Sequence, residues 1–215
     1  MACATCIRMA RYPSRSWRAF DPQRTAAGAA AAAPSAPLVL EGLRVLGLDP
    51  GSRTTGFGVL ESRSGQWLHI AHGCIVVPPA ATLAVRLRLI FERLSELVAL
   101  HRPAEVAIER VFVNRNVDSA LKLGQARGAA LCAVPHGLAV FEYAPRAIKL
   151  ALVGSGAAEK RQVAHMVRAL LALEGPLAAD AADALAVALC HGHSRQLARL
   201  AAAHGAAPIG SGFHR

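Results

Sequence analysis

Hydrophobic residues occur in two spacings along residues 43–193: short continuous runs, and longer stretches with a helical period. The short runs end at Gly, Pro or an acidic residue and predict β-strands. They cover residues 44–49, 55–61, 67–76, 105–109 and 138–143. Apolar positions three or four residues apart predict helices over residues 84–101, 119–134, 158–173 and 178–191.

The order of these elements predicts the fold class. Three strands come first, separated by turns that include Pro50 and Gly65, and helices then alternate with the remaining strands. A strand meander followed by helix–strand alternation predicts an α/β domain, a mixed sheet with helices packed on it. The sequence shows no internal repeat.

The two ends of the chain differ from the middle. Residues 1–42 contain five Arg and two acidic residues, then a run of alanines, and they lack a sustained period. We expect a disordered basic extension that the domain does not need, with an upstream extension of the true start or a targeting peptide as alternatives. The Ala- and Gly-rich residues 194–215 are expected to form a frayed tail, so the predicted domain is 43–193.

Composition narrows the class of partner. The 24 Lys and Arg against 14 Asp and Glu give a formal net charge of +10, which favours a polyanion such as nucleic acid or an acidic membrane surface. No strongly apolar run is long enough to predict a membrane-spanning helix. Five Cys, an odd number, argue against a secreted disulfide framework, and Cys3 and Cys6 lack the second pair that a zinc site needs.

The scarce acidic residues stand where a site would form. Asp49 and Glu109 each end an apolar strand, and parallel neighbouring strands would bring both to the edge where open α/β sheets bind ligands. Asp180 and Asp183 are three residues apart on one predicted helix face, with no Lys or Arg between them. A divalent cation shared by all four carboxylates would remove the repulsion between them.

Each acid also has a purely structural explanation. Asp180 suits a helix N-cap, Asp183 suits the helix dipole, and Asp49 suits the start of an Asp-Pro-Gly turn.

Carboxylates without His or Cys at metal spacing favour Mg²⁺ or Mn²⁺, and two such ions would promote phosphodiester hydrolysis. The histidines are expected on helix faces or the surface: His136, His165, His191 and His193. A basic protein with this acidic site is predicted to be a nuclease.

Four segments resemble the RuvC family of bacterial Holliday-junction resolvases. They are residues 46–56 (LGLDPGSRTTG), 107–112 (AIERVF), 118–128 (DSALKLGQARG) and 179–186 (ADAADALA), with FEY at 141–143 and AEK at 158–160 between them. The resemblance covers residues 43–193 and implies a ribonuclease-H-like fold, a five-stranded mixed sheet with helices on both faces. It implies catalytic, metal-binding roles for four acids that hold two Mg²⁺ ions, replaceable by Mn²⁺: Asp49, Glu109, Asp180 and Asp183.

The resemblance also implies an activity and partners. The protein would be a cytoplasmic homodimeric endodeoxyribonuclease that makes paired nicks in four-way DNA junctions during recombination and repair. Its partners would be the junction DNA and a branch-migration complex of the RuvA–RuvB type, and it would not bind a membrane. Phe112 would stack on an unpaired base, and Lys149 and Lys160 would act near the scissile phosphate. The alternatives are that Phe112 is a core aromatic residue and that the two lysines are ordinary solvated charges. Further candidate phosphate contacts are Arg115, Lys122, Arg127 and Arg146.

Three other functions are compatible with parts of the sequence. Residues 49–56 resemble the phosphate loop of actin-like and sugar-kinase ATPases, although the chain lacks a second copy of such a lobe. A non-catalytic junction-binding protein would not need four converging acids. A ribonuclease H or a transposase would share the fold and differ in substrate.

Overall fold

The computed structural model describes residues 40–111 and 117–204. The chain divides into two units, Met1–Pro37 and Leu38–Arg215, and the described residues all belong to the second. The strands are β1 (Arg44–Asp49), β2 (Thr54–Arg63), β3 (Gln66–Val76), β4 (Glu105–Glu109) and β5 (Ala139–Tyr143). The helices are α2 (Leu83–His101), α3 (Val117–Cys132), α4 (Pro145–Val153), α5 (Lys160–Leu170) and α6 (Ala179–Ala203).

One five-stranded sheet forms the centre of this unit, in the order β3-β2-β1-β4-β5. Strands β1, β2 and β3 form an antiparallel meander, whereas β4 runs parallel to both β1 and β5. The mixed α/β sheet predicted from the sequence is therefore confirmed. Strand β1, near the start of the described residues, occupies the middle of the sheet.

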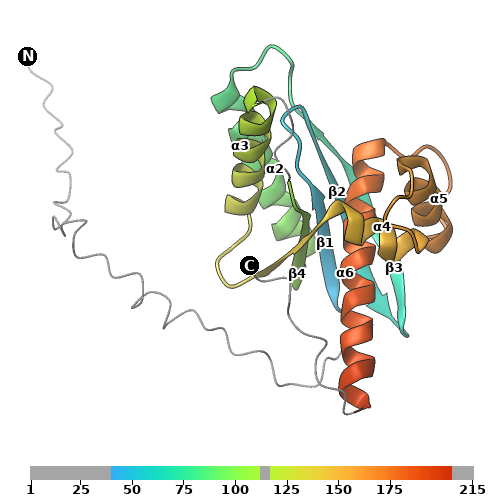
Figure 1. Cartoon of the computed structure of the whole chain (residues 1–215). Helices are drawn as coiled ribbons and strands as arrows, with labels where there is room; N and C mark the ends of the chain where they lie inside the picture. Colours follow the sequence, from blue (N-terminus) through green and yellow to red (C-terminus); the bar gives the residue numbers. More distant parts are fainter. Residues whose placement is uncertain (1–39, 112–116, 205–215) are drawn as a thin grey trace, which may run out of the picture. The chain divides into compact units, whose positions relative to one another are not determined.

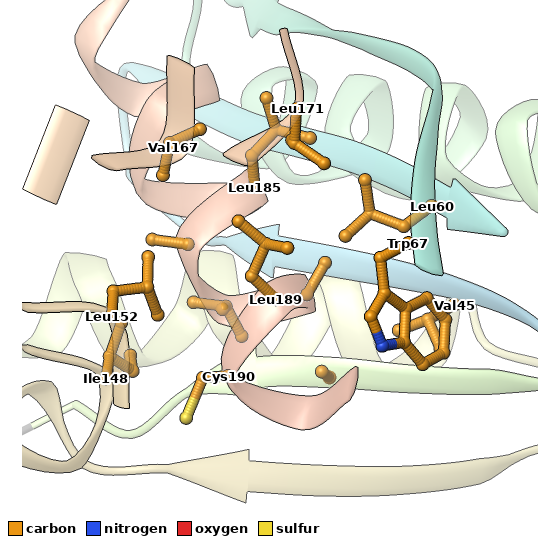
Figure 2. Close-up of a cluster of buried hydrophobic side chains, with 14 of the residues drawn as sticks. Val45, Leu60, Trp67, Ile148, Leu152, Val167, Leu171, Leu185, Leu189 and Cys190 are labelled. Atoms are coloured by element: carbon orange, nitrogen blue, oxygen red, sulfur yellow. The ribbon is translucent and has the colours of Figure 1, made fainter. Parts of the chain in front are cut away.

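Helices cover both faces of the sheet (Figure 1). Helices α2 and α3 pack on one face over a core that includes Leu46, Leu48 and Ile108. Helices α4, α5 and α6 lie on the other face, where Leu185 and Leu189 of α6 pack with side chains from the strands and from α5 (Figure 2). Burial of these two apolar clusters is the main contribution to the stability of the layers.

Helix α6 lies unusually close to the sheet because glycines face it. A Cβ placed on Gly47 of β1 would lie 2.2 Å from the carbonyl oxygen of Ala184, and one on Gly58 of β2 would lie 2.6 Å from Leu185 Cδ2. Real Cβ atoms do not approach so closely, so only glycine fits at these strand positions. On the helix side, the small residues Ala184 and Ala188 of α6 face Gly47.

Three details differ from the sequence-based expectation. The sequence analysis does not predict α4, which has only nine residues, although Pro145 at its first turn and Gly154 after its end, at φ 79°, are typical helix boundaries. Helix α6 continues to Ala203, ten residues beyond the expected domain end at 193, so the start of the predicted frayed tail is helical. Leu40 is buried and the Gly42 amide donates to the Ser62 carbonyl, so ordered structure begins before residue 43.

No helix among the residues described is both long and apolar enough to cross a membrane.

Candidate active site

Two of the four predicted acids end adjacent parallel strands. Asp49 is the last residue of β1 and Glu109 is the last residue of β4. The residues just before them, Leu48 and Ile108, are paired across the two strands. Both carboxylates therefore leave the sheet at the same edge, as the sequence predicts.

Helix α6 brings the other two acids to this edge. Asp180 and Asp183 lie at the start of α6, with Asp180 in its first turn. Gly56 is the β2 partner of Asp49, and a Cβ on Gly56 would lie 1.9 Å from the carbonyl oxygen of Asp180. The backbone of Asp180 thus touches the strand position next to Asp49, which places the start of α6 over the ends of β1 and β2.

Burial and mutual repulsion both perturb the acids. The pKa of Asp49 rises from 3.8 to about 7, mainly because the carboxyl is buried and further because Glu109, Asp183 and Asp180 are negative. The pKa of Glu109 is also raised, first by burial and then by Asp183. These shifts show that the four carboxylates act on one another in a partly desolvated space, which is typical of functional sites.

Two lysines lie beside the acids. Lys160 begins α5, and its Nζ lies 2.9 Å from Asp183 Oδ2, a contact that raises the pKa of the lysine. The positive charge of Lys149 on α4 lowers the pKa of Glu109 against the effect of burial. The structure therefore brings both lysines of the predicted DNA-contact set to the acidic site, and their role toward a phosphate stays a prediction.

A cavity of about 260 Å³ opens beside Asp49 and Glu109. It is further lined by residues that follow β1 and β4 and by residues of α3 and α4: Pro50, Arg110, Val111, Leu123 and Pro145. The sequence analysis did not select Arg110, although its position directly after Glu109 was the available signal. Arg110 also lies 3.6 Å from the carboxylate of Glu142.

The other predicted DNA contacts are dispersed. Lys122 forms an ion pair with Asp118 along α3, with 2.6 Å between Nζ and Oδ2. Arg127 is mostly buried and bonds Glu142 Oε1 at 2.6 Å, a placement that favours linking α3 to β5. The aliphatic part of Arg146 packs against Gly156. Phe112 and Arg115 lie outside the described residues.

The donor set fits a divalent cation. It consists of hard carboxylate oxygens; burial, and then the negative charge of the neighbouring acids, raises the pKa of Asp49 and of Glu109, and a cation would relieve this repulsion. Within residues 40–111 and 117–204, no three His, Cys, Asp or Glu side chains already stand around a common metal position. Binding of a cation by these acids would therefore require their side chains to rotate.

Comparison with known proteins decides the family. The sequence model described as "Crossover junction endodeoxyribonuclease RuvC" matches residues 45–191. The chain belongs to the RuvC family. The segments that carry the resemblance correspond to the β1–β2 region, the end of β4, helix α3 and the start of α6, so all four acids fall within the matched region.

Relatives named crossover junction endodeoxyribonuclease RuvC match about three quarters of the chain. The protein of Methylococcus capsulatus is 58% identical over 154 residues, which is 71% of this chain and 92% of that protein. The protein of Halorhodospira halophila is 57% identical over 164 residues, covering 76% of this chain and 98% of the relative. The match thus spans nearly the full length of these RuvC proteins.

Solved structures agree with the fold. Thermus thermophilus RuvC in complex with a Holliday junction substrate superposes with a TM-score of 0.68 at 35% identity, covering 72% of this chain and 96% of that one. The yeast mitochondrial Holliday junction resolvase Ydc2 has a TM-score of 0.57 at 12% identity, covering 78% and 86%, and supports the fold alone. The ribonuclease-H-like class implied by the sequence is confirmed.

Proposed function

We propose that this RuvC-family protein is a divalent-metal-dependent endodeoxyribonuclease that resolves four-way DNA junctions during homologous recombination and repair. The observation that carries the proposal is the meeting of Asp49, Glu109, Asp180 and Asp183 at one edge of the sheet. Family membership and the 58% identity to a named RuvC protein support the same activity. The reaction is hydrolysis of a phosphodiester bond.

The four carboxylates would hold two Mg²⁺ ions, with Mn²⁺ as a substitute. Bound divalent ions supply an activated water and stabilise the leaving oxygen in phosphodiester hydrolysis. On the protein side, Asp49 must lose the proton that its pKa of about 7 favours before it can act as a ligand. Lys160 contacts only Oδ2 of Asp183, and its side chain, 82% exposed, has room to turn toward a phosphate.

The DNA would be bound by the basic and aromatic residues predicted around the acidic site. Lys149 and Lys160 stand next to the acids and would contact the phosphate that is cut. Phe112, three residues after Glu109, would stack on an unpaired base at the junction centre. Arg115, Lys122, Arg127 and Arg146 are weaker candidates, and Lys122 and Arg127 would have to give up ion pairs with Asp118 and Glu142.

Paired nicks require two sites with fixed spacing. One chain contributes one set of the four acids, so we propose a homodimer that cuts two strands of the junction symmetrically. A branch-migration complex of the RuvA–RuvB type would present the junction, and the proposed compartment is the cytoplasm. These partners follow from the family resemblance.

The test compares a mobile synthetic four-way junction with a linear duplex of matched sequence. Each is incubated with wild-type protein or Asp49→Asn, in Mg²⁺ or in chelator. Symmetric nicking of the junction alone, lost in chelator and in the variant, is expected. Metal-independent binding without nicking would establish a non-catalytic junction-binding protein, cleavage of RNA–DNA hybrid would point to a ribonuclease H, and tight ATP binding would favour the ATPase alternative.

A further inference from the structure

A buried polar network lies on the α6 side of the sheet and includes none of the four acids. His191, 1% exposed, has its Nε2 2.6 Å from Glu105 Oε2 and its Nδ1 2.7 Å from the Tyr143 hydroxyl. Arg195 donates from Nε to Glu105 Oε2 at 2.9 Å and from Nη2 to the other carboxylate oxygen. The guanidinium also lies over the ring of Phe141, 4.8 Å from its centroid. The sequence analysis expected His191 on a helix face or at the surface; it lies on α6, on the face that is buried against the sheet.

The network has one consistent arrangement of protons. The charge of Glu105 is matched by Arg195, and burial lowers the pKa of His191 to about 4, so the imidazole is neutral. Burial raises the pKa of Tyr143 to about 12, so the phenol keeps its proton. The Tyr143 hydroxyl therefore donates to Nδ1 of His191, and Nε2–H donates to the Glu105 carboxylate.

The network joins the elements that carry the acids. Glu105 begins β4 and Glu109 ends it, while His191 and Arg195 follow Asp180 and Asp183 on α6. Tyr143 is the β5 partner of Glu109 in the sheet register, and its carbonyl accepts a 2.8 Å hydrogen bond from the Arg110 amide. Paired residues point to the same face of a sheet, so the side chains of Tyr143 and Glu109 both leave on the α6 side.

We propose that Tyr143 and His191 are positioning residues that fix the register of α6 against β4 and thereby the spacing of Glu109 from Asp180 and Asp183. The inference rests on the proposed function, since it assigns these residues to the metal-binding arrangement. A rigid helix transmits the position of His191 to the acids at its start. Loss of the Tyr143 hydroxyl leaves Nδ1 of His191 without its donor, which loosens this link while the aromatic packing remains.

The test measures Mn²⁺ affinity of the full-length protein without DNA, by calorimetry or by the paramagnetic resonance of free Mn²⁺. Tyr143→Phe is expected to raise the dissociation constant about 10-fold. The Mn²⁺ concentration for half-maximal junction cleavage should rise in parallel, while junction affinity measured in Ca²⁺ stays at the wild-type value. Arg195→Lys, which keeps the charge beside Glu105, should give a smaller rise and serves if Tyr143→Phe does not fold.

Glu61→Gln is the matched control. Glu61 is a buried carboxylate of β2 that bonds two arginines, Arg44 through Nε at 3.0 Å and Arg63 through Nε at 2.5 Å. It lies opposite Arg44, at the other end of β1 from Asp49. This variant should lose stability and keep wild-type Mn²⁺ affinity.

Each result has a defined meaning. Wild-type Mn²⁺ affinity in Tyr143→Phe overturns the positioning role, and so does a loss of affinity that Glu61→Gln shares in proportion to its loss of stability. If the wild-type protein cleaves no junction, the proposed function fails. In that case the Mn²⁺ measurement alone still decides whether the network positions the acids.

Discussion

Lys160 Nζ lies 2.9 Å from Asp183 Oδ2, so a lysine cation neutralises one of the four acids. The two residues come from different helices, α5 and α6, and Asp183 is mostly buried whereas Lys160 is exposed. The contact brings an exposed positive charge to the edge of the sheet where β1 and β4 end with Asp49 and Glu109.

Lys160→Gln should separate stability from activity. An ion pair with an exposed partner contributes about 0–1 kcal/mol, so the free energy of unfolding should hardly change. Junction cleavage should fall about 100-fold if the lysine stabilises charge on the phosphate. Arg161→Gln is the control, because Arg161 is the exposed neighbour that pairs with Glu159. Equal losses of cleavage in both variants would contradict a specific role for Lys160.

Asp49→Asn and Asp183→Asn should each abolish nicking and retain junction binding. Both variants remove a proposed metal ligand and leave the basic residues that would contact DNA unchanged. Nicking is followed on a labelled junction, and binding is followed by gel shift in Ca²⁺. Glu96→Gln, a change at an exposed acid of α2 paired with Arg93, should behave as wild type. Loss of binding in the Asp variants would instead indicate that the acids are structural.

The pKa of Asp49 predicts a pH dependence of stability without metal. Between pH 3.8 and about 7 the folded protein keeps a proton on Asp49 that the unfolded chain has lost. The free energy of unfolding attributable to Asp49 therefore falls as pH rises through this window and is constant above it. His191 acts in the opposite direction, since its pKa is lowered from 6.5 to about 4.

Comparison with Asp49→Asn isolates the contribution of Asp49, because the amide cannot titrate. In chelator, urea unfolding should show that the variant gains stability over wild type as pH rises from 4 to 7, and added Mn²⁺ should reverse the order at pH 8. A stability difference that is independent of pH would show that Asp49 titrates normally.

Gly56→Ala should damage the site through the backbone. The added carbon would lie 1.9 Å from the Asp180 carbonyl oxygen, so the start of α6 must move away from Asp49. We expect a loss of stability of about 1–3 kcal/mol and at least a 10-fold loss of cleavage. Gly128→Ala in α3, where nothing lies within 4 Å of the new carbon, should be neutral or slightly stabilising. Denaturant unfolding and junction nicking measure both effects.

Deletion of residues 1–37 should preserve folding and junction cleavage. Extending the deletion through residue 42 should cost about 2 kcal/mol or more, because it removes Leu40, which is 4% exposed, and the Gly42 amide that bonds Ser62. Thermal unfolding of the two truncated proteins makes the comparison. An unfolded product from the shorter deletion would refute a dispensable extension.

Local patterns were sufficient to predict the sheet and the acids. The positions of Asp49 and Glu109 could be predicted because each ends an apolar strand, and those of Asp180 and Asp183 because their spacing defines a helix face. The buried network could not be found, since Glu105 and His191 are 86 residues apart and only the docking of α6 brings them together. The role of Gly56 was equally hidden, because a glycine in a strand does not reveal which backbone lies against it.

Helix α6, the last element of the described chain, contributes two of the four acids and the residues that pack against the glycines of β1 and β2. A chain emerging from the ribosome therefore has no complete acidic site while only the strands and the earlier helices have been synthesised. The complete set of four acids assembles only when α6 docks on the sheet, so a partly synthesised copy lacks the proposed nuclease site.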